Sequence, residues 1–260
     1  MRNAPPRLIH FDAKELDSVS ERRRFLGNLA IAVGAIGLVP MIRRGAGIGE
    51  LLAQSGGETE PGLSDTDILN YALTLEYLEA TFYLRADSTG PLPTGAIVAA
   101  IDPDGMGAPG TVPGLSGRMA PAPATFSVPT FVRAVRDHEI IHVLALKSAL
   151  GANALPRDQF AFDFGTAFDS AANFMATALV LEDTGVTAYL GQAGNLDSLA
   201  ILGTAGTILG VEAEHAATFR LLNNQPVSPN DADFDSPKSS SEIVAAAGGF
   251  ITAAPALPFP

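Results

Sequence analysis

Two short stretches decide the fold that the sequence predicts: Asp137-His-Glu-Ile-Ile-His142 and Val211-Glu-Ala-Glu-His215. In each stretch a glutamate is followed three residues later by a histidine, so both side chains lie on one helix face, about one turn apart. Each stretch also lies in the middle of an apolar stripe with helical spacing. The sequence therefore predicts two helices that each turn a Glu-x-x-His pair toward a hydrophobic core.

Four segments carry this helical periodicity, and together they predict an all-α fold, an antiparallel four-helix bundle. We expect the four helices at about residues 64–86, 129–150, 169–190 and 196–222. Ser64 and Asp67 have the spacing of a capping box at the start of the first helix. Gly151 and Gly191 are expected to end the second and third helices. Three glycines inside the fourth helix are expected to permit close packing: Gly203, Gly206 and Gly210.

The remaining segments lack a sustained period. Residues 45–63 are Gly-rich and polar and are typical of a linker. Residues 87–127 are dense in Gly and Pro and predict a long loop inserted between the first two helices. Residues 225–260 form a Pro- and Ser-rich tail, for which the capping-box spacing of Ser239 and Glu242 predicts one short helix.

Glutamate or histidine interrupts the core stripe of every predicted helix. The first helix adds Glu76 and Glu79 to the two Glu-x-x-His pairs, and the third helix adds Glu182. Buried carboxylates without partners are costly and repel one another, and a pair of divalent or trivalent metal ions removes both problems. One glutamate from each of two helices and one Glu-x-x-His pair from each of the other two make a carboxylate-bridged dinuclear site. The expected ligands are Glu76, Glu139, His142, Glu182, Glu212 and His215.

A weak internal repeat relates the first and third helices. Each contains a glutamate followed seven residues later by a tyrosine, Glu76 with Tyr83 and Glu182 with Tyr189. Seven residues are two turns, so each tyrosine is expected on the face of its glutamate, ~10 Å further along the axis. Packing with a hydrogen-bonded hydroxyl is the favoured role of the two tyrosines, and a redox role is the alternative.

Two further residues stand near this predicted site without a fixed role. Glu79 breaks the repeat, because Gly185 stands at the equivalent position. Three roles remain open for Glu79: an additional carboxylate of the site, a proton relay, or the partner of an arginine such as Arg136. His138 precedes Glu139 but lies off the core stripe, which favours a surface position or a supporting role behind a ligand.

At these residues the chain resembles the ferritin-like superfamily, and more narrowly the bacterial ferritin-like domain family that includes desiccation-related proteins. The stretches that carry the resemblance are residues 68–83, 137–142, 181–189 and 211–215. The resemblance covers about residues 64–224 and implies that the six expected ligands hold metal, with Glu139 and Glu212 as bridging carboxylates. The insertion at 87–127 departs from compact ferritins and does not favour their cage assembly. The oligomeric state stays open.

Composition and charge restrict the chemistry further. The 260 residues include no cysteine, which excludes disulfides, thiolate metal sites and cysteine nucleophiles. Any metal is therefore held by carboxylate oxygen and imidazole nitrogen. The formal net charge of −12 disfavours binding to nucleic acid, because an acidic surface repels phosphate groups.

The N-terminal segment, residues 1–44, is typical of an export signal. Residues 22–26 read Arg-Arg-Arg-Phe-Leu and precede an almost uncharged run at 27–41, which resembles the twin-arginine signal. This run is short for a membrane-spanning helix, which needs ~20 apolar residues. Arg43 and Arg44 follow the run without a clean cleavage site, so membrane anchoring by an uncleaved segment stays open. We expect an exported protein, periplasmic or otherwise outside the cytoplasm of a prokaryote.

Two functions of different classes fit these patterns. The first is a metal-dependent redox protein with two iron or manganese ions that reacts with oxygen or peroxide. The second is a non-catalytic structural or binding protein of the cell envelope that keeps its metal as a staple. The resemblance does not choose between them, because the superfamily includes ferroxidases, peroxidases, manganese catalases and oxygen-activating oxidases. Carboxylate–imidazole sites serve iron and manganese alike.

Overall fold

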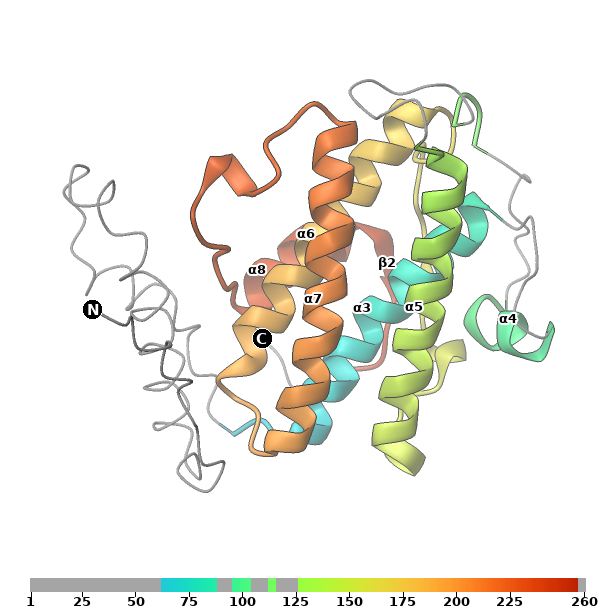
Figure 1. Ribbon diagram of the computed structural model, residues 1–260. Helices are drawn as coiled ribbons and strands as arrows, with labels where there is room; N and C mark the ends of the chain where they lie inside the picture. Colours follow the sequence, from blue (N-terminus) through green and yellow to red (C-terminus); the bar gives the residue numbers. More distant parts are fainter. Residues whose placement is uncertain (1–61, 88–94, 104–111, 116–125, 257–260) are drawn as a thin grey trace, which may run out of the picture. The chain divides into compact units, whose positions relative to one another are not determined.

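Four long helices dominate the computed structural model, which describes residues 62–87, 95–103, 112–115 and 126–256 (Figure 1). They are α3 (Asp65–Ala86), α5 (Val128–Leu150), α6 (Ala171–Ala193) and α7 (Leu199–Leu222). The all-α bundle is therefore confirmed. The largest differences from the predicted ends are three residues, at the end of α6 (193 against 190) and at the start of α7 (199 against 196).

A serine caps the start of each long helix. The side-chain oxygens of Ser64, Ser127, Ser170 and Ser198 each accept a hydrogen bond from the backbone N–H three residues later. At the first helix, the Asp67 carboxylate also accepts from the Ser64 N–H at 2.9 Å, which completes the expected capping box. Each cap satisfies a backbone donor that the first helical turn leaves unpaired, and each contributes ~1 kcal/mol.

The long helices pack mainly as two pairs, α3 with α5 and α6 with α7, and α3 also contacts α6 (Figure 1). Aromatic rings fill the core beside Tyr83. The rings of Phe82 and Phe174 stack with 5.1 Å between their centroids, and Phe219 stacks against Tyr83 at 6.0 Å. This apolar packing joins both helix pairs, because the stacked residues come from α3, α6 and α7.

The segments that were predicted as loop and tail also contain regular structure. Helix α4 (Gly95–Ile101) lies inside the predicted loop, and Ile101 is buried in the core. Seven residues are too few to reveal a period in the sequence. Helix α8 (Ser240–Ala247) begins at the capping box of Ser239 and packs against α6.

A short antiparallel strand pair connects the segment before α6 to the C-terminal segment. Strand β1 (Ala161–Phe162) pairs with β2 (Ile251–Ala253), and Ala161 lies opposite Ala253. Single 3₁₀ turns complete the described structure: η3 (Gly151–Asn153), η4 (Arg157–Gln159), η5 (Pro229–Asp231) and η6 (Gly248–Phe250). Across the described ranges, no helix has the length and apolar character that crossing a membrane requires. The predicted signal and linker lie outside these ranges.

The two glycines that were expected to end helices have different roles in the structure. Gly151 has a positive φ of 57° and ends α5, as expected. Gly191 does not end a helix: it lies inside α6, and a Cβ there would stand 2.0 Å from the carbonyl oxygen of Lys238. The close approach of the tail therefore explains why a glycine stands at position 191, and the end of a helix does not.

The close packing expected at the glycines of α7 is wrong. Gly203, Gly206 and Gly210 are exposed, and no atom of the described chain lies within 4 Å of a Cβ built at any of them. The predicted core stripe of α7 is buried or half-buried in the structure, but these three glycines lie on the exposed face of the helix.

We predict opposite effects of alanine at two of these glycines. Gly191→Ala should lower the free energy of unfolding by roughly 1–3 kcal/mol, because the methyl group overpacks the contact with Lys238. Gly206→Ala is the matched control and should raise it by up to ~1 kcal/mol, because alanine has the higher helix propensity. Denaturant unfolding of both variants measures this. Equal effects at the two positions would contradict the close contact between α6 and the tail.

Candidate metal centre

The structure brings the six expected ligand residues together inside the bundle. Glu76 comes from α3, Glu139 and His142 from α5, Glu182 from α6, and Glu212 and His215 from α7. All six are buried, and the four glutamates are between 0% and 1% exposed. Helical spacing within each Glu-x-x-His pair and packing between the helices thus place four carboxyl groups and two imidazoles in one apolar interior.

Each histidine turns its Nδ1 atom toward the glutamates. His142 Nδ1 lies 3.3 Å from Glu76 Oε2, 3.1 Å from Glu139 Oε2 and 3.2 Å from Glu212 Oε1. His215 Nδ1 lies 3.0 Å from Glu182 Oε2 and 3.1 Å from Glu139 Oε1. His142 therefore contacts the glutamates of both Glu-x-x-His pairs and Glu76 of α3. His215 contacts the glutamate of the other pair and Glu182 of α6.

Potential ligand atoms form two overlapping groups. The first consists of Glu76, Glu139, His142 and Glu212, and the second of Glu139, Glu182, Glu212 and His215. Within each group the ligand atoms lie within 4.8 Å of one another. Glu139 and Glu212 belong to both groups, which is the arrangement that two metal positions with shared carboxylates require.

Two tyrosine–glutamate hydrogen bonds cross between α3 and α6. Tyr189 on α6 donates to Glu76 Oε1 on α3 at 2.6 Å. Tyr83 on α3 donates to Glu182 Oε1 on α6. The repeat in the sequence placed each tyrosine on the face of its own glutamate, whereas in the structure each tyrosine binds the glutamate of the other helix. Each bond leaves the second oxygen of its glutamate facing the histidines.

Several carboxylate oxygens of this cluster accept no hydrogen bond. They are Glu76 Oε2, Glu139 Oε1 and both side-chain oxygens of Glu212. A buried carboxylate oxygen without a donor is costly, and native proteins rarely leave such atoms unpaired. Glu76, Glu139 and Glu212 each offer an oxygen to the groups whose ligand atoms lie within 4.8 Å of one another, so the donor set fits hard cations that prefer oxygen and imidazole ligands.

The ionisation of these groups shows the same surplus of negative charge. Burial raises the pKa of Glu76 to about 7, and burial and the neighbouring Glu139 raise the pKa of Glu212 well above its ordinary value. Glu139 is the exception: the neighbouring His142 and His215 outweigh its burial and lower its pKa. Despite burial, Glu182 and Glu139 raise the pKa of His215 to about 11. Without metal, protons on the glutamates and positive charges on the histidines therefore offset the negative charge that cations would otherwise balance.

Glu79 lies at the edge of this cluster, and the structure explains why Gly185 stands opposite it. A Cβ at Gly185 would lie 2.4 Å from Glu212 Oε2 and 3.3 Å from Glu79 Oε1. Only glycine leaves room for both carboxyl groups. Burial and then the negative charge of Glu212 raise the pKa of Glu79 well above its ordinary value.

The arginine partner considered for Glu79 is contradicted. Arg136 donates instead to the carbonyl oxygen of Asp87 at 2.9 Å and to Asp137 Oδ1 at 2.7 Å. Glu79 therefore remains either an additional carboxylate of the centre or a proton relay.

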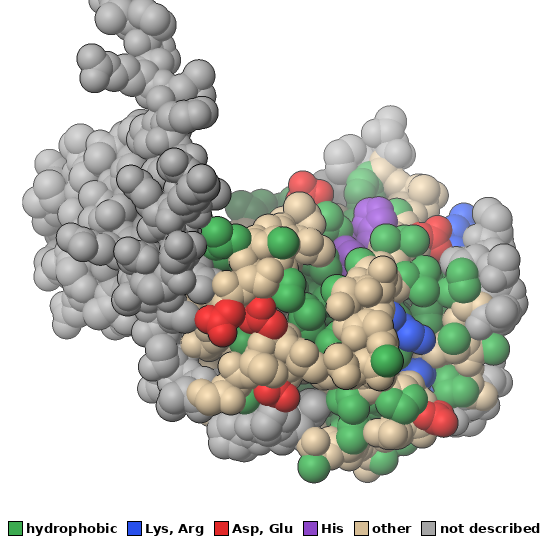
Figure 2. All heavy atoms as spheres, turned by 90° about the horizontal axis from the view of Figure 1, so that it is seen from below, with side chains coloured by type: hydrophobic (Ala, Val, Ile, Leu, Met, Phe, Trp, Pro, Cys, Tyr) green, Lys and Arg blue, Asp and Glu red, His purple; other side chains and the backbone are tan. Residues whose placement is uncertain are grey.

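His138 connects the cluster to the protein surface. It is exposed, and its Nδ1 atom lies 2.9 Å from Nε2 of His215. Burial and the neighbouring His215 lower the pKa of His138. Histidine side chains reach the surface in the space-filling view, with hydrophobic side chains beside them (Figure 2). The sequence indicated only that His138 lies off the core stripe, since its partner is 77 residues away.

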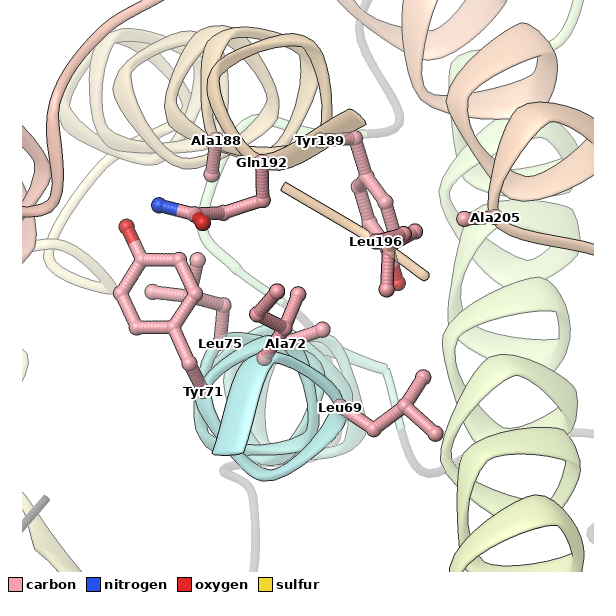
Figure 3. A pocket seen from close by; sticks show the side chains of 10 residues that line it. Leu69, Tyr71, Ala72, Leu75, Ala188, Tyr189, Gln192, Leu196 and Ala205 are labelled. Atoms are coloured by element: carbon pink, nitrogen blue, oxygen red, sulfur yellow. The ribbon is translucent and has the colours of Figure 1, made fainter. Parts of the chain in front are cut away.

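An apolar pocket of about 20 Å³ lies beside the cluster, between α3, α6 and α7. Figure 3 shows side chains of α3, among them Ala72 and Leu75, facing Ala188 and Gln192 of α6. Tyr189 lines the pocket and also donates to Glu76. The pocket therefore ends one side chain away from the carboxylates and has room for about one small molecule.

A four-helix bundle with this set of buried carboxylates and imidazoles defines the class of ferritin-like proteins. Comparison with protein families matches residues 64–225 to the ferritin-like domain. Because the match covers more than half of the chain, the protein belongs to the ferritin-like domain family. A search of curated proteins finds no match to the chain.

We predict that the metal-free protein loses stability as the pH rises from 5 to 7. The pKa of Glu76 is about 7 in the folded state against an ordinary value of 4.5, so the folded state keeps a proton that the unfolded chain releases. Its contribution is full below pH 4.5 and is lost as the pH rises through 7. The free energy of unfolding should fall by ~1 kcal/mol per pH unit for each such proton.

Denaturant unfolding with excess chelator measures this slope. Glu76→Gln should flatten it, because glutamine imitates the protonated carboxyl group and does not titrate. A metal-free protein that becomes more stable between pH 5 and pH 7 would show that these carboxyl groups are ionised in the folded state.

Proposed function

We propose that the protein binds two iron or manganese ions in the bundle and uses them for redox chemistry with oxygen or peroxide. The observation that carries the proposal is the pair of overlapping ligand groups that share Glu139 and Glu212. The proposed ligands are Glu76, Glu139, His142, Glu182, Glu212 and His215.

Charge supports two cations rather than one. Four ionised glutamates carry four negative charges, which two divalent ions balance, and the imidazoles can then bind through neutral Nδ1 atoms. A single ion would satisfy one of the two groups and leave the outer glutamate and histidine of the other group unchanged. Glu139 and Glu212 are the proposed bridging carboxylates, because each of them belongs to both ligand groups.

The other residues of the cluster hold the ligands in place. Tyr189 and Tyr83 each occupy one oxygen of Glu76 and Glu182, which leaves the other oxygen to face the centre. Gly185 leaves the space that the carboxyl groups of Glu212 and Glu79 occupy. When bound, iron or manganese would supply the electron transfer that carboxylates and imidazoles cannot perform themselves.

Burial of the cluster favours a small substrate. The ligands are almost inaccessible to solvent, so a large organic molecule cannot contact them without rearrangement of the helices. Oxygen and peroxide are small enough for the neighbouring pocket, which has room for about one such molecule. This supports chemistry on oxygen or peroxide over chemistry on a bulky substrate.

Variants of two glutamates on α7 test the metal centre. Purified protein should contain about two iron or manganese ions per chain by elemental analysis. Glu212→Gln keeps the shape of the side chain but removes the charge that both groups share, so it should reduce the content to one ion or less. The matched control is Glu214→Gln, two residues away and exposed, which should keep two ions.

Turnover of peroxide and oxidation of ferrous iron, assayed on the same samples, separate the two functions. Fast turnover that Glu212→Gln abolishes supports the redox protein. Two bound ions without turnover support the alternative, a non-catalytic structural or binding protein whose metal acts as a staple. Protein that binds no metal even after reconstitution would contradict both.

We further propose export by a twin-arginine route, with the protein outside the cytoplasm. The support is the sequence of residues 22–41, in which the arginine pair precedes an apolar run. Replacing Arg22 and Arg23 by lysine should keep the protein in the cytoplasm of a bacterial host, as fractionation would measure. The same replacement at Arg43 and Arg44 is the control and should leave export intact. An unchanged distribution in both variants would sink the proposal.

A further inference from the structure

The two histidines of the proposed centre differ in what their outer nitrogens contact. His215 faces the carboxylates with Nδ1, 3.0 Å from Glu182 Oε2, and its outer Nε2 lies 2.9 Å from His138 Nδ1. The rings of His138 and His215 are nearly parallel, with 10° between their planes and 5.2 Å between their centroids. His142 also faces the carboxylates with Nδ1, but no described residue binds its outer nitrogen in this way.

This contact gives the outer nitrogen of His215 a hydrogen-bond partner, so the inner nitrogen is left to bind metal. A neutral imidazole has one N–H donor and one acceptor nitrogen, and only the acceptor nitrogen can bind a metal. When His215 Nε2 donates to His138 Nδ1 across this 2.9 Å contact, the proton of the neutral imidazole stays on the outer nitrogen. Nδ1 lies 3.0 Å from Glu182 Oε2 and 3.1 Å from Glu139 Oε1, so a metal that displaces its proton would meet the lone pair without rotation of the ring.

The two Glu-x-x-His pairs differ in the residue that precedes the glutamate. His138 directly precedes Glu139, and Val211 directly precedes Glu212 at the equivalent position. Valine has no polar atom that could accept from His142. The two halves of the centre therefore carry the same ligand types but different supports behind their imidazoles.

We propose that His138 is a positioning residue that makes the two metal positions unequal. The position formed by Glu139, Glu182, Glu212 and His215 binds metal more tightly than the position formed by Glu76, Glu139, His142 and Glu212. This inference rests on the proposed dinuclear centre. Partners behind a metal-binding histidine raise its basicity and hold its ring, and their loss typically weakens metal binding ~10–100-fold.

Calorimetric titration of the metal-free full chain with Mn²⁺ tests the inference. The unmutated chain should bind two ions in two separate steps. His138→Phe keeps a flat ring against His215 but removes the acceptor, so it should weaken the tighter step by ~10-fold or more and leave the weaker step unchanged. His138→Asn restores an acceptor and should recover most of the affinity. Val211→Ala is the matched control and should change neither step.

The outcomes separate this inference from the proposed function. Two unchanged steps in His138→Phe, or an equal loss in His138→Asn and His138→Phe, would overturn the inference alone. Equal losses of metal affinity and of metal-free melting temperature in both His138 variants would also overturn it, because His138 would then act by packing. An unmutated chain that binds neither Mn²⁺ nor Fe²⁺ would overturn the proposed function and the inference with it.

Discussion

The repulsion among five buried glutamates is the constraint on which the rest of this structure depends. Water cannot solvate these carboxyl groups, and the helices bring them together from four directions. Each neighbouring feature reduces the resulting free-energy cost: two imidazoles approach the oxygens, two tyrosines donate to them, and Gly185 makes room for them. The oxygens that still accept no hydrogen bond are the part of the cost that a proton or a cation would remove.

The glutamates and histidines of the cluster share the interior of the bundle with the apolar stripes of the four helices. A stripe of Val, Leu and Phe drives each helix against its neighbours, and the same burial forces any glutamate on the stripe into the shared interior. The aromatic packing of Phe82, Phe174 and Phe219 then holds α3, α6 and α7 in a fixed arrangement beside the cluster. Fold and centre are therefore two results of one pattern.

Residues whose role depends on their own helix were predictable from the sequence. The period of the stripes located the four helices, and the spacing of Glu139 and His142 placed both side chains on one face. Contacts between distant segments were not predictable, because a period identifies the face of a helix but not the residue that meets it. Tyr83 and Glu182 are 99 residues apart, and the carbonyl of Lys238 that requires Gly191 belongs to the tail. Short helices such as α4 were not predictable for a different reason, because seven residues are too few to show a helical period.

The crossed tyrosine bonds give this single chain the symmetry of a dimer. Tyr83 of the first helical hairpin binds Glu182 of the second, and Tyr189 of the second binds Glu76 of the first. Such reciprocal contacts, in which i meets j and j meets i, are the signature of an isologous interface between identical subunits. Within each helix pair a histidine contacts the pair's own glutamate, His142 with Glu76 and His215 with Glu182, while the tyrosine comes from the other pair. The two halves of the chain therefore complete each other's ligand positions, and loss of either tyrosine hydroxyl removes a donor from the glutamate of the other half.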